Sequence, residues 1–405
     1  MYEIKNLKSK VEELSDHGVK LLSELIEIPA ISPDSGGKGE LAKAEKIMEY
    51  LDGFDVERVD VEDERALGGV RPNIIAKIKG YRKRTIWIVS HMDVVPEGDE
   101  KLWTTPPFKA VIRDGKIYGR GSEDNGQSLV ASLIAGRAIL ELNYQPEYTF
   151  GLVFVSDEET GSKYGIQDLL KRKIFKKDDL IVVPDGGTPA GNMVEIAEKS
   201  ILWMRFSVFG KQTHASTPEK GLNASRLAMN FLIRIDEVLN KKFNAENNLF
   251  SPPRSTFEPT KREKNVDNVN TIPGLDISYM DCRIIPEYNP DDVVSLVEEE
   301  KEKFEKESGA RIEVEVVQKE SSPPTDENSE VVRVLKKALE LARGVKAGVY
   351  GMGGNTCGAF FRKAGFQTAV WSTVDNTAHQ PNEYCRIDNL VADAKVFAVI
   401  PFIKT

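Results

Sequence analysis

The chain contains 405 residues, a length that predicts two or three domains. Hydrophobic residues make up 40% and charged residues 29%, as in folded globular proteins, while the net charge of −9 argues against a nucleic-acid partner and against adsorption to a membrane. No apolar run reaches the ~18–20 residues that span a bilayer. The first residues, Met1–Leu7, contain no apolar signal segment, so we expect a cytoplasmic location.

The first half of the chain predicts an α/β sheet. Two of its runs are almost entirely apolar, which is typical of central strands covered on both faces. Helical periodicity predicts helices over residues 5–28, about 40–51 and 127–142; strands are expected at 73–78, 85–90, 148–155 and 180–183, with a hairpin at 111–118.

The pattern changes after about Glu195. The strands expected there are 201–209, 254–264, 275–285 and 311–317, and the helices are 222–239 and 291–307; a helix at 331–342, a glycine-rich loop at 351–354 and a strand at 368–371 follow. This order predicts a small α+β domain inserted into an α/β domain. We expect the α/β domain to comprise residues 1–196 and 319–405, and the inserted domain residues 197–318.

Polar side chains follow four of the predicted apolar strands. They include His91 and Asp93, Asp124, the pair Glu158-Glu159, and Asp185. Ligands of open α/β sheets gather at the carboxyl ends of strands. Carboxylates that converge there repel one another unless a cation neutralises them. Histidine and carboxylate ligands without thiolates suit Zn²⁺, and also Co²⁺ or Mn²⁺.

Each of these features also has a plainer interpretation. His91 beside Asp93 fits a surface histidine next to an unrelated acid as well as it fits a metal ligand with its orienting carboxylate. Glu158-Glu159 fits two solvated acids at the start of a helix, or one metal ligand beside one general base. His379 follows the last predicted strand and can supply a second imidazole, whereas His214, remote from the acids, fits a structural role.

Several motifs together resemble one known family. These motifs occur in the family's order along nearly the whole chain. They are Ser90-His91-Met92-Asp93, Gly119-Arg120-Gly121 with Asp124, Asp157-Glu158-Glu159-Thr160-Gly161, Asp185-Gly186, Lys211–Pro218, Asp281-Cys282-Arg283 and His379–Glu383. This set is similar to the co-catalytic zinc amidohydrolases and exopeptidases, such as acetylornithine deacetylase, succinyl-diaminopimelate desuccinylase, aminoacylase and carboxypeptidase G. The resemblance implies a zinc-exopeptidase-like catalytic domain with an inserted α+β dimerisation or lid domain.

The resemblance also implies two divalent metal ions, zinc in the first place and cobalt or manganese as alternatives. One ion would be held by His91 and Asp185 and the other by Glu159 and His379. Asp124 would bridge the two ions.

The resemblance assigns catalytic and binding roles as well. Glu158 would be the general base, Asp93 would orient His91, and His214 would stabilise the tetrahedral oxyanion in the partner subunit of a homodimer. Asn270 and Arg283 would contact the substrate, with Arg283 binding its carboxylate.

Two segments depart from the family pattern. Asp124 is followed by Asn125-Gly126-Gln127, where the family usually has a Lys-Gly pair one residue on. The late loop reads Gly353-Gly354-Asn355-Thr356-Cys357, where desuccinylases have Gly-Gly-Thr-Ser-Asp. The amides of Gly353 and Gly354 can still bind a carboxylate. The second difference argues against a succinyl-diaminopimelate substrate.

We therefore expect a metal-dependent hydrolase that cleaves the amide bond of small N-acyl amino acids, of the deacetylase or desuccinylase type. The alternative is a metallo-exopeptidase, a dipeptidase or carboxypeptidase acting on short peptides, with the same metal site. A third possibility is a non-catalytic binding protein on the same fold.

Overall fold

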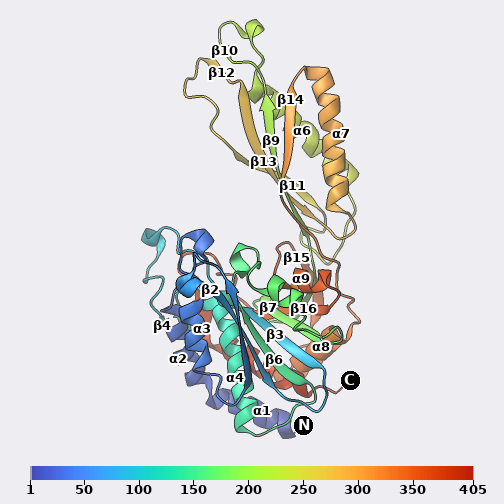
Figure 1. Cartoon of the computed structure of the whole chain (residues 1–405). Coiled ribbons are helices and arrows are strands. Elements are labelled where there is room, and N and C mark those ends of the chain that lie inside the picture. The colour runs from blue at the N-terminus through green and yellow to red at the C-terminus, as the bar shows by residue number, and fades with distance from the viewer. Residues whose placement is uncertain (1, 405) are drawn as a thin grey trace. The chain divides into compact units, whose positions relative to one another are not determined.

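A computed structural model describes residues 2–404 and divides the chain into two units (Figure 1). Unit 1 runs to Ile196 and includes Thr325–Tyr350 and the chain from Thr356 onward, and unit 2 comprises Ala197–Pro324 and Gly351–Asn355. The inserted segment ends later than the residue 318 expected from the sequence. The reason is that its last strand, β14 (Arg311–Glu320), continues beyond that position.

An eight-stranded mixed sheet forms the centre of unit 1. Its spatial order is β1-β2-β6-β3-β7-β16-β8-β15, and β6, β3, β7 and β16 run parallel to their neighbours in that group. The strands are β1 (Asp55–Glu62), β2 (Val70–Ile78), β3 (Thr85–His91), β6 (Thr149–Val155), β7 (Leu180–Thr188), β8 (Met193–Glu198), β15 (Gly348–Met352) and β16 (Gln367–Thr373). A smaller sheet joins β4 (Val111–Arg113), β5 (Lys116–Tyr118) and β17 (Tyr384–Arg386).

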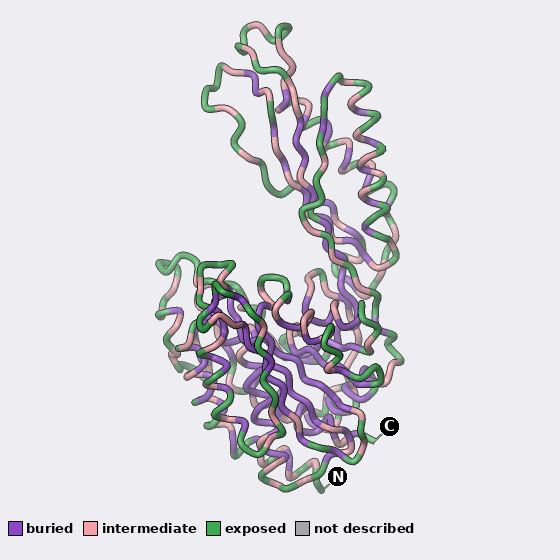
Figure 2. The backbone as a smooth tube through the Cα atoms, viewed as in Figure 1, coloured by how far each residue is buried: buried purple, intermediate pink, exposed green. Residues whose placement is uncertain are grey.

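Both faces of the large sheet are covered, which explains why its central strands are apolar throughout. All seven residues of β3 are buried, and Figure 2 shows buried backbone running through the middle of this unit. Trp87 and Val89 pack with residues of α5 and α9 on one face. Gly151 of β6 lies against the Trp87 ring, where an added Cβ would approach a ring carbon to 2.3 Å.

Eight helices of the described chain belong to unit 1. The predicted helix over residues 5–28 is in fact two helices separated at Leu14, a break that no proline or glycine announces. The helices are α1 (Tyr2–Glu13), α2 (Ser15–Ile26), α3 (Leu41–Met48), α4 (Ser128–Glu141), α5 (Ile166–Lys171), α8 (Glu330–Arg343), α9 (Cys357–Lys363) and α10 (Ile387–Val399). None of the helices described in the structure is both long and apolar enough to cross a membrane.

Unit 2 is the predicted α+β layer. Its four antiparallel strands lie in the order β11-β13-β9-β14, with β11 (Thr256–Arg262), β13 (Leu275–Ile284) and β9 (Ser200–Phe209). Helices α6 (Ala224–Lys242) and α7 (Pro290–Ser308) pack on this sheet. A two-residue ladder joins β10 (Thr213–His214) to β12 (Thr271–Ile272).

Phe231 lies at the centre of this second core. Its ring is fully buried and packs 5.7 Å from the ring of Phe206 and 5.4 Å from that of Phe304. We predict that Phe231→Ala lowers the free energy of unfolding of unit 2 by about 3–5 kcal/mol, because truncation leaves a cavity that the core fills only in part. Urea denaturation of the whole chain measures this loss.

The matched control is Ile233→Ala on the same helix, whose side chain is 58% exposed. It should change stability by less than about 0.5 kcal/mol. Equal effects of the two substitutions would contradict the assigned core.

Candidate metal centre

The candidate site lies where parallel strands end. β3 ends in His91, which is in register with Val155 at the end of β6, and Asp185 lies within β7. Parallel strands in register bring their carboxyl ends to one edge of the sheet. Glu158 and Glu159 lie in the turn after β6, Asp124 lies just before α4, and His379 follows β16.

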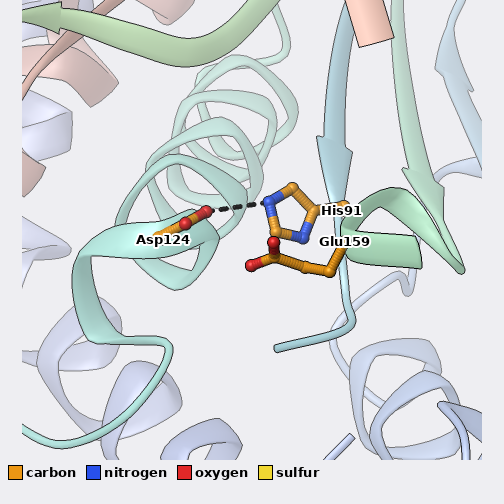
Figure 3. A group of neighbouring side chains, drawn as sticks. All are labelled: His91, Asp124 and Glu159. Carbon is orange, nitrogen blue, oxygen red and sulfur yellow. Dashed lines mark hydrogen bonds and ion pairs between the residues drawn. The ribbon is translucent and has the colours of Figure 1, made fainter. Parts of the chain in front are cut away.

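Two clusters of ligand atoms share Asp124. His91 Nε2 lies 2.9 Å from Asp124 Oδ1 and 3.6 Å from Asp185 Oδ1. His379 Nε2 lies 3.0 Å from Asp124 Oδ2 and 3.1 Å from Glu159 Oε1. Figure 3 shows Asp124 and Glu159 turned toward His91. Ligands about 2.0–2.1 Å from a tetrahedral ion lie about 3.3 Å from one another, so these separations fit a metal site.

The donor set also fits a cation by its charge. Four carboxylates surround two imidazoles at the sheet edge; they belong to Asp124, Glu158, Glu159 and Asp185. The ligand atoms of His91, Asp124 and Glu159 lie within 4.8 Å of one another. Those of His91, Glu158 and Asp185 form a second group of the same size. Such a group of acids is stable only with compensating positive charge. Imidazole and carboxylate ligands suit zinc and neighbouring divalent metals.

The second nitrogen of His91 fixes which nitrogen can bind a metal. Nδ1 lies 3.0 Å from the main-chain oxygen of Asp93 and 3.6 Å from its carboxylate Oδ1. Nδ1–H therefore donates to the Asp93 carbonyl, which leaves Nε2 to face Asp124 and Asp185. The resemblance assigns the orientation of His91 to Asp93, and the contact that orients the ring comes mainly from the main-chain oxygen of this residue.

The Asp93 carboxylate has a second task that the sequence did not reveal. It accepts the backbone N–H groups of Glu158 at 3.0 Å and of Glu159 at 2.9 Å. Burial would raise the pKa of Asp93, but His91 and these N–H donors outweigh burial and lower it. Asp93 therefore stays ionised and aligns two further residues of the site.

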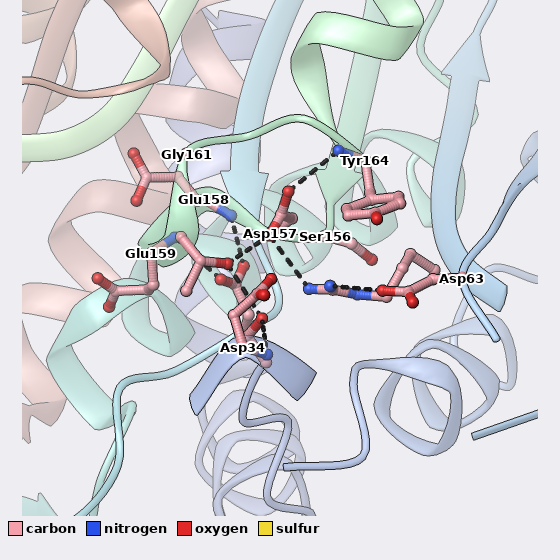
Figure 4. A network of polar contacts seen from close by, with 12 residues as sticks. Asp34, Asp63, Ser156, Asp157, Glu158, Glu159, Gly161 and Tyr164 are labelled. Carbon is pink, nitrogen blue, oxygen red and sulfur yellow. Dashed lines mark hydrogen bonds and ion pairs between the residues drawn. The ribbon is translucent and has the colours of Figure 1, made fainter. Parts of the chain in front are cut away.

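A buried network supports the turn that carries these glutamates (Figure 4). Asp157 adopts φ 69°, a strained conformation for a non-glycine residue. Its carboxylate accepts the N–H of Tyr164 at 3.0 Å and a hydrogen bond from Thr160, and lies 3.5 Å from Arg71 Nη2. Arg71, itself fully buried, pairs in a bidentate manner with Glu40 at 2.5 and 2.6 Å. No pattern in the sequence distinguishes Arg71 or Glu40 from surface residues.

Asn125 holds the ligand on β7. Its Nδ2 donates to Asp185 Oδ1 at 3.0 Å and to the carbonyl of Pro184 at 2.8 Å. Asn125, which lies in a segment that departs from the family pattern, thus fixes a carboxylate of the site through a neutral amide.

Hydrogen bonding and burial perturb the titration of the cluster. Hydrogen bonds to Asp124 and Glu159 raise the pKa of His379 to about 10. Burial, with Asp124 nearby, raises the pKa of Glu159 to about 7. Burial and the charge of Asp185 raise the pKa of Glu158 well above its usual range. A carboxyl group with a raised pKa is suited to take and return a proton near neutral pH.

The remaining predicted residues all belong to unit 2. His214 is exposed, and its Nδ1 accepts the N–H of Ser216 at 3.1 Å, so that Nε2–H is free to donate. The carbonyl of Asn270 accepts the N–H of Ala215, the residue after His214, at 2.8 Å. His214 ends β10 and pairs with Thr271, and Asn270 lies directly before β12.

Arg283 already has partners within unit 2. It pairs in a bidentate manner with Asp281 at 2.7 and 3.0 Å, and its Nη1 donates to the carbonyl of Gly353 at 3.1 Å. Gly353 and Gly354 border open space, since no atom lies within 4 Å of an added Cβ at either position.

Two imidazoles around one shared carboxylate, with the half-buried Glu158 beside them, suit the chemistry of a metal-dependent hydrolase. A family model described as Peptidase family M20/M25/M40 matches residues 87–401. The chain therefore belongs to this family of metallohydrolases, and its mixed α/β fold with an inserted domain agrees with that of the family.

Three similar proteins illustrate the range of the family. An uncharacterized metallohydrolase of Methanocaldococcus jannaschii is 46% identical over 95% of this chain and 98% of its own length. A succinyl-diaminopimelate desuccinylase of Psychrobacter arcticus is 24% identical over 97% of this chain and 96% of its own. The crystal structure of human carnosine dipeptidase 1 matches with a TM-score of 0.78 at 19% identity, over 98% of each chain.

Metal binding should release protons. Because the pKa of His379 is raised to about 10, its imidazole is protonated at pH 7.5, and a metal ion must displace that proton. We predict that the logarithm of the apparent Zn²⁺ association constant rises between pH 6 and 8 by about one per pH unit for each proton released. Calorimetry of chelator-treated protein in buffers of different ionisation heat counts the protons.

His379→Gln should release one proton fewer. His17→Gln, which replaces an exposed histidine of α2, should release the same number as the unaltered protein. Zinc binding without proton release would contradict the assignment of His379.

Proposed function

We propose that this chain hydrolyses the amide bond of small N-acyl amino acids, of the deacetylase or desuccinylase type, at a centre of two divalent metal ions. One observation carries the proposal. Asp124 turns one carboxylate oxygen to within 2.9 Å of His91 and the other to within 3.0 Å of His379. A carboxylate that faces two separate imidazoles in this way is suited to bridge two ions.

In this proposal His91 and Asp185 hold one ion, Glu159 and His379 hold the other, and Asp124 binds both. Nitrogen and oxygen ligands favour zinc, and cobalt or manganese also fit. When bound, the ions lower the pKa of water and polarise the carbonyl group of the substrate.

Glu158 moves the proton in this reaction. Its carboxylate takes a proton from the attacking water and returns it to the nitrogen of the scissile amide, so the C–N bond breaks into a carboxylate and an amine. Its buried environment raises its pKa well above the usual range, which favours the protonated form that must protonate the amine. Asp93 accepts the backbone N–H of Glu158 at 3.0 Å and so fixes the main chain from which this side chain extends.

His214 is proposed to stabilise the oxyanion that forms when water attacks the carbonyl group, acting in a homodimer formed through the inserted domain. The support is its tautomer. Because Nδ1 accepts the N–H of Ser216, the neutral ring carries its proton on Nε2, where it can be donated to a developing negative charge.

The leading substrate class and its alternative differ in one group. Next to the scissile amide, an N-acyl amino acid presents an acyl group without an amine, neutral in an N-acetyl and anionic in an N-succinyl derivative, where a dipeptide presents an ammonium. Desuccinylases among the relatives support the first class, whereas the fold is shared with dipeptidases and carboxypeptidases, which support the alternative of a metallo-exopeptidase.

A substrate panel separates these classes. We predict that N-acetyl and N-succinyl derivatives of an amino acid are hydrolysed with a kcat/KM at least tenfold above that of the glycyl dipeptide of the same amino acid, using zinc- or cobalt-loaded protein. A dipeptide preference of the same size would establish the exopeptidase alternative and overturn the proposed substrate.

Glu158→Gln tests the base. This change keeps the size of the side chain but removes the proton acceptor, so kcat should fall by about 10²–10⁴-fold while the metal content is retained. Kinetics and elemental analysis of the same sample provide both readings. Glu57→Gln, at an exposed position of β1, should keep normal kcat, and a Glu158→Gln variant with normal kcat would exclude Glu158 as the base.

A further inference from the structure

Two loops that carry proposed ligands lie far apart in the sequence and hold each other. The Asp124 loop comprises residues 119–125, and the His379 loop comprises residues 375–383. Each loop contributes one glutamate, Glu123 or Glu383, which belongs to neither ligand set. Both glutamate side chains are buried, with 4% and 0% of their surface exposed.

Glu383 binds the backbone of the Asp124 loop. Its carboxylate accepts the N–H groups of Gly121 at 3.0 Å, Glu123 at 3.0 Å and Asp124 at 3.1 Å. Arg120 Nη1 adds an ion pair at 2.7 Å. Three backbone donors on one buried carboxylate fix the path of the chain on both sides of the proposed bridging residue.

Glu123 binds the backbone of the His379 loop in return. Its carboxylate accepts the N–H groups of Asp375 at 2.6 Å and Ala378 at 3.1 Å, and that of Thr377. The hydroxyl of Thr377 also donates to it at 3.0 Å. Ala378, the residue before His379, is therefore hydrogen-bonded to Glu123, the residue before Asp124.

The two carboxylates depend on each other. A buried carboxylate is costly unless it is hydrogen-bonded, and all of these backbone donors come from the opposite loop. Each loop is therefore held only while the other is in place. Such mutual dependence makes the pair of loops order as one element, with Asp124 and His379 at a set distance.

We infer that Glu123 and Glu383 form a reciprocal clamp that sets the position of His379 against Asp124, and that both are positioning residues for the metal ion held by Glu159 and His379. This inference rests on the proposed two-metal centre. It assigns the two glutamates neither a contact with the metal nor a proton transfer.

The clamp has a directional consequence. Glu123 binds only the His379 loop, so its loss should loosen one ion and leave the ion of His91 and Asp185 in place. Glu383 binds the N–H of Asp124 itself, and Asp124 serves both ions. Loss of Glu383 should therefore weaken both.

The experiment is a titration of chelator-treated full-length protein with Co²⁺, followed by visible absorption and by competition with a chromophoric chelator. Glu123→Gln should weaken one of the two equivalents of Co²⁺ at least tenfold and the other less than threefold. Glu383→Gln should weaken both equivalents at least tenfold, since outer contacts of metal ligands typically change affinity by about 10–100-fold. Thr377→Val, which removes a single donor to Glu123, should weaken the same single equivalent as Glu123→Gln and to a smaller extent.

The control is Glu195→Gln. Glu195 is a fully buried glutamate of unit 1 that pairs with Arg362 at 2.8 Å, and neither residue belongs to either loop. It should lower thermal stability and leave both metal affinities unchanged. Thermal unfolding of each chelator-treated variant separates lost stability from lost positioning, and Thr377→Val preserves the test if either glutamine variant does not fold.

Three outcomes would overturn the inference. Two equivalents bound by the unaltered protein, with no change in Glu123→Gln and Thr377→Val, would refute the clamp alone. Equal weakening by Glu195→Gln would show that affinity follows stability. A single equivalent bound by the unaltered protein would refute the two-metal proposal and the clamp with it.

Discussion

The structure of the site depends on Asp124, whose two carboxylate oxygens face two different imidazoles. His91 comes from the end of a central strand, and His379 comes from a loop near the other end of the chain. Hydrogen bonds from both imidazoles hold the pKa of Asp124 well below its usual range, even though burial acts in the opposite direction. The carboxylate is therefore ionised and shared, which is what a bridge between two cations requires.

Much of the surrounding structure keeps this shared carboxylate and its neighbours in place. Asp93 holds the backbone of Glu158 and Glu159, and the fully buried Arg71–Glu40 pair supports the turn that follows. A buried ion pair is rarely worth much for stability alone, because the charges lose their hydration. The Arg71–Glu40 pair lies next to Asp157, which directly precedes Glu158 and Glu159. This location indicates that the pair fixes the position of the turn that carries the two glutamates.

Sequence patterns predicted the parts that are local. Apolar runs predicted β3, β6 and β7, and the alternation and amphipathicity after residue 195 predicted the six main elements of unit 2 in their order. The α/β fold with an inserted domain, and the family, are confirmed. Of the five residues that the resemblance implies as ligands, His91 ends β3 and Asp185 lies within the later part of β7, while Asp124, Glu159 and His379 lie in segments that follow strands.

The parts that the sequence did not predict depend on contacts between distant segments. Glu123 and Glu383 bind backbone N–H groups more than 250 positions away, and neither has a sequence pattern that names its partner. β1 was missed because five of its eight residues are charged, as expected for an exposed edge strand. Arg71 reads as a surface residue in the sequence, and only the fold shows that Glu40 neutralises it.

A crystal structure of the zinc-soaked protein, with anomalous data at the zinc edge, tests the central claim most directly. The account predicts two anomalous peaks about 3.5–4 Å apart, one beside each oxygen of Asp124. A single peak at full occupancy under excess zinc, or two peaks with Asp124 bound to only one of them, would contradict it.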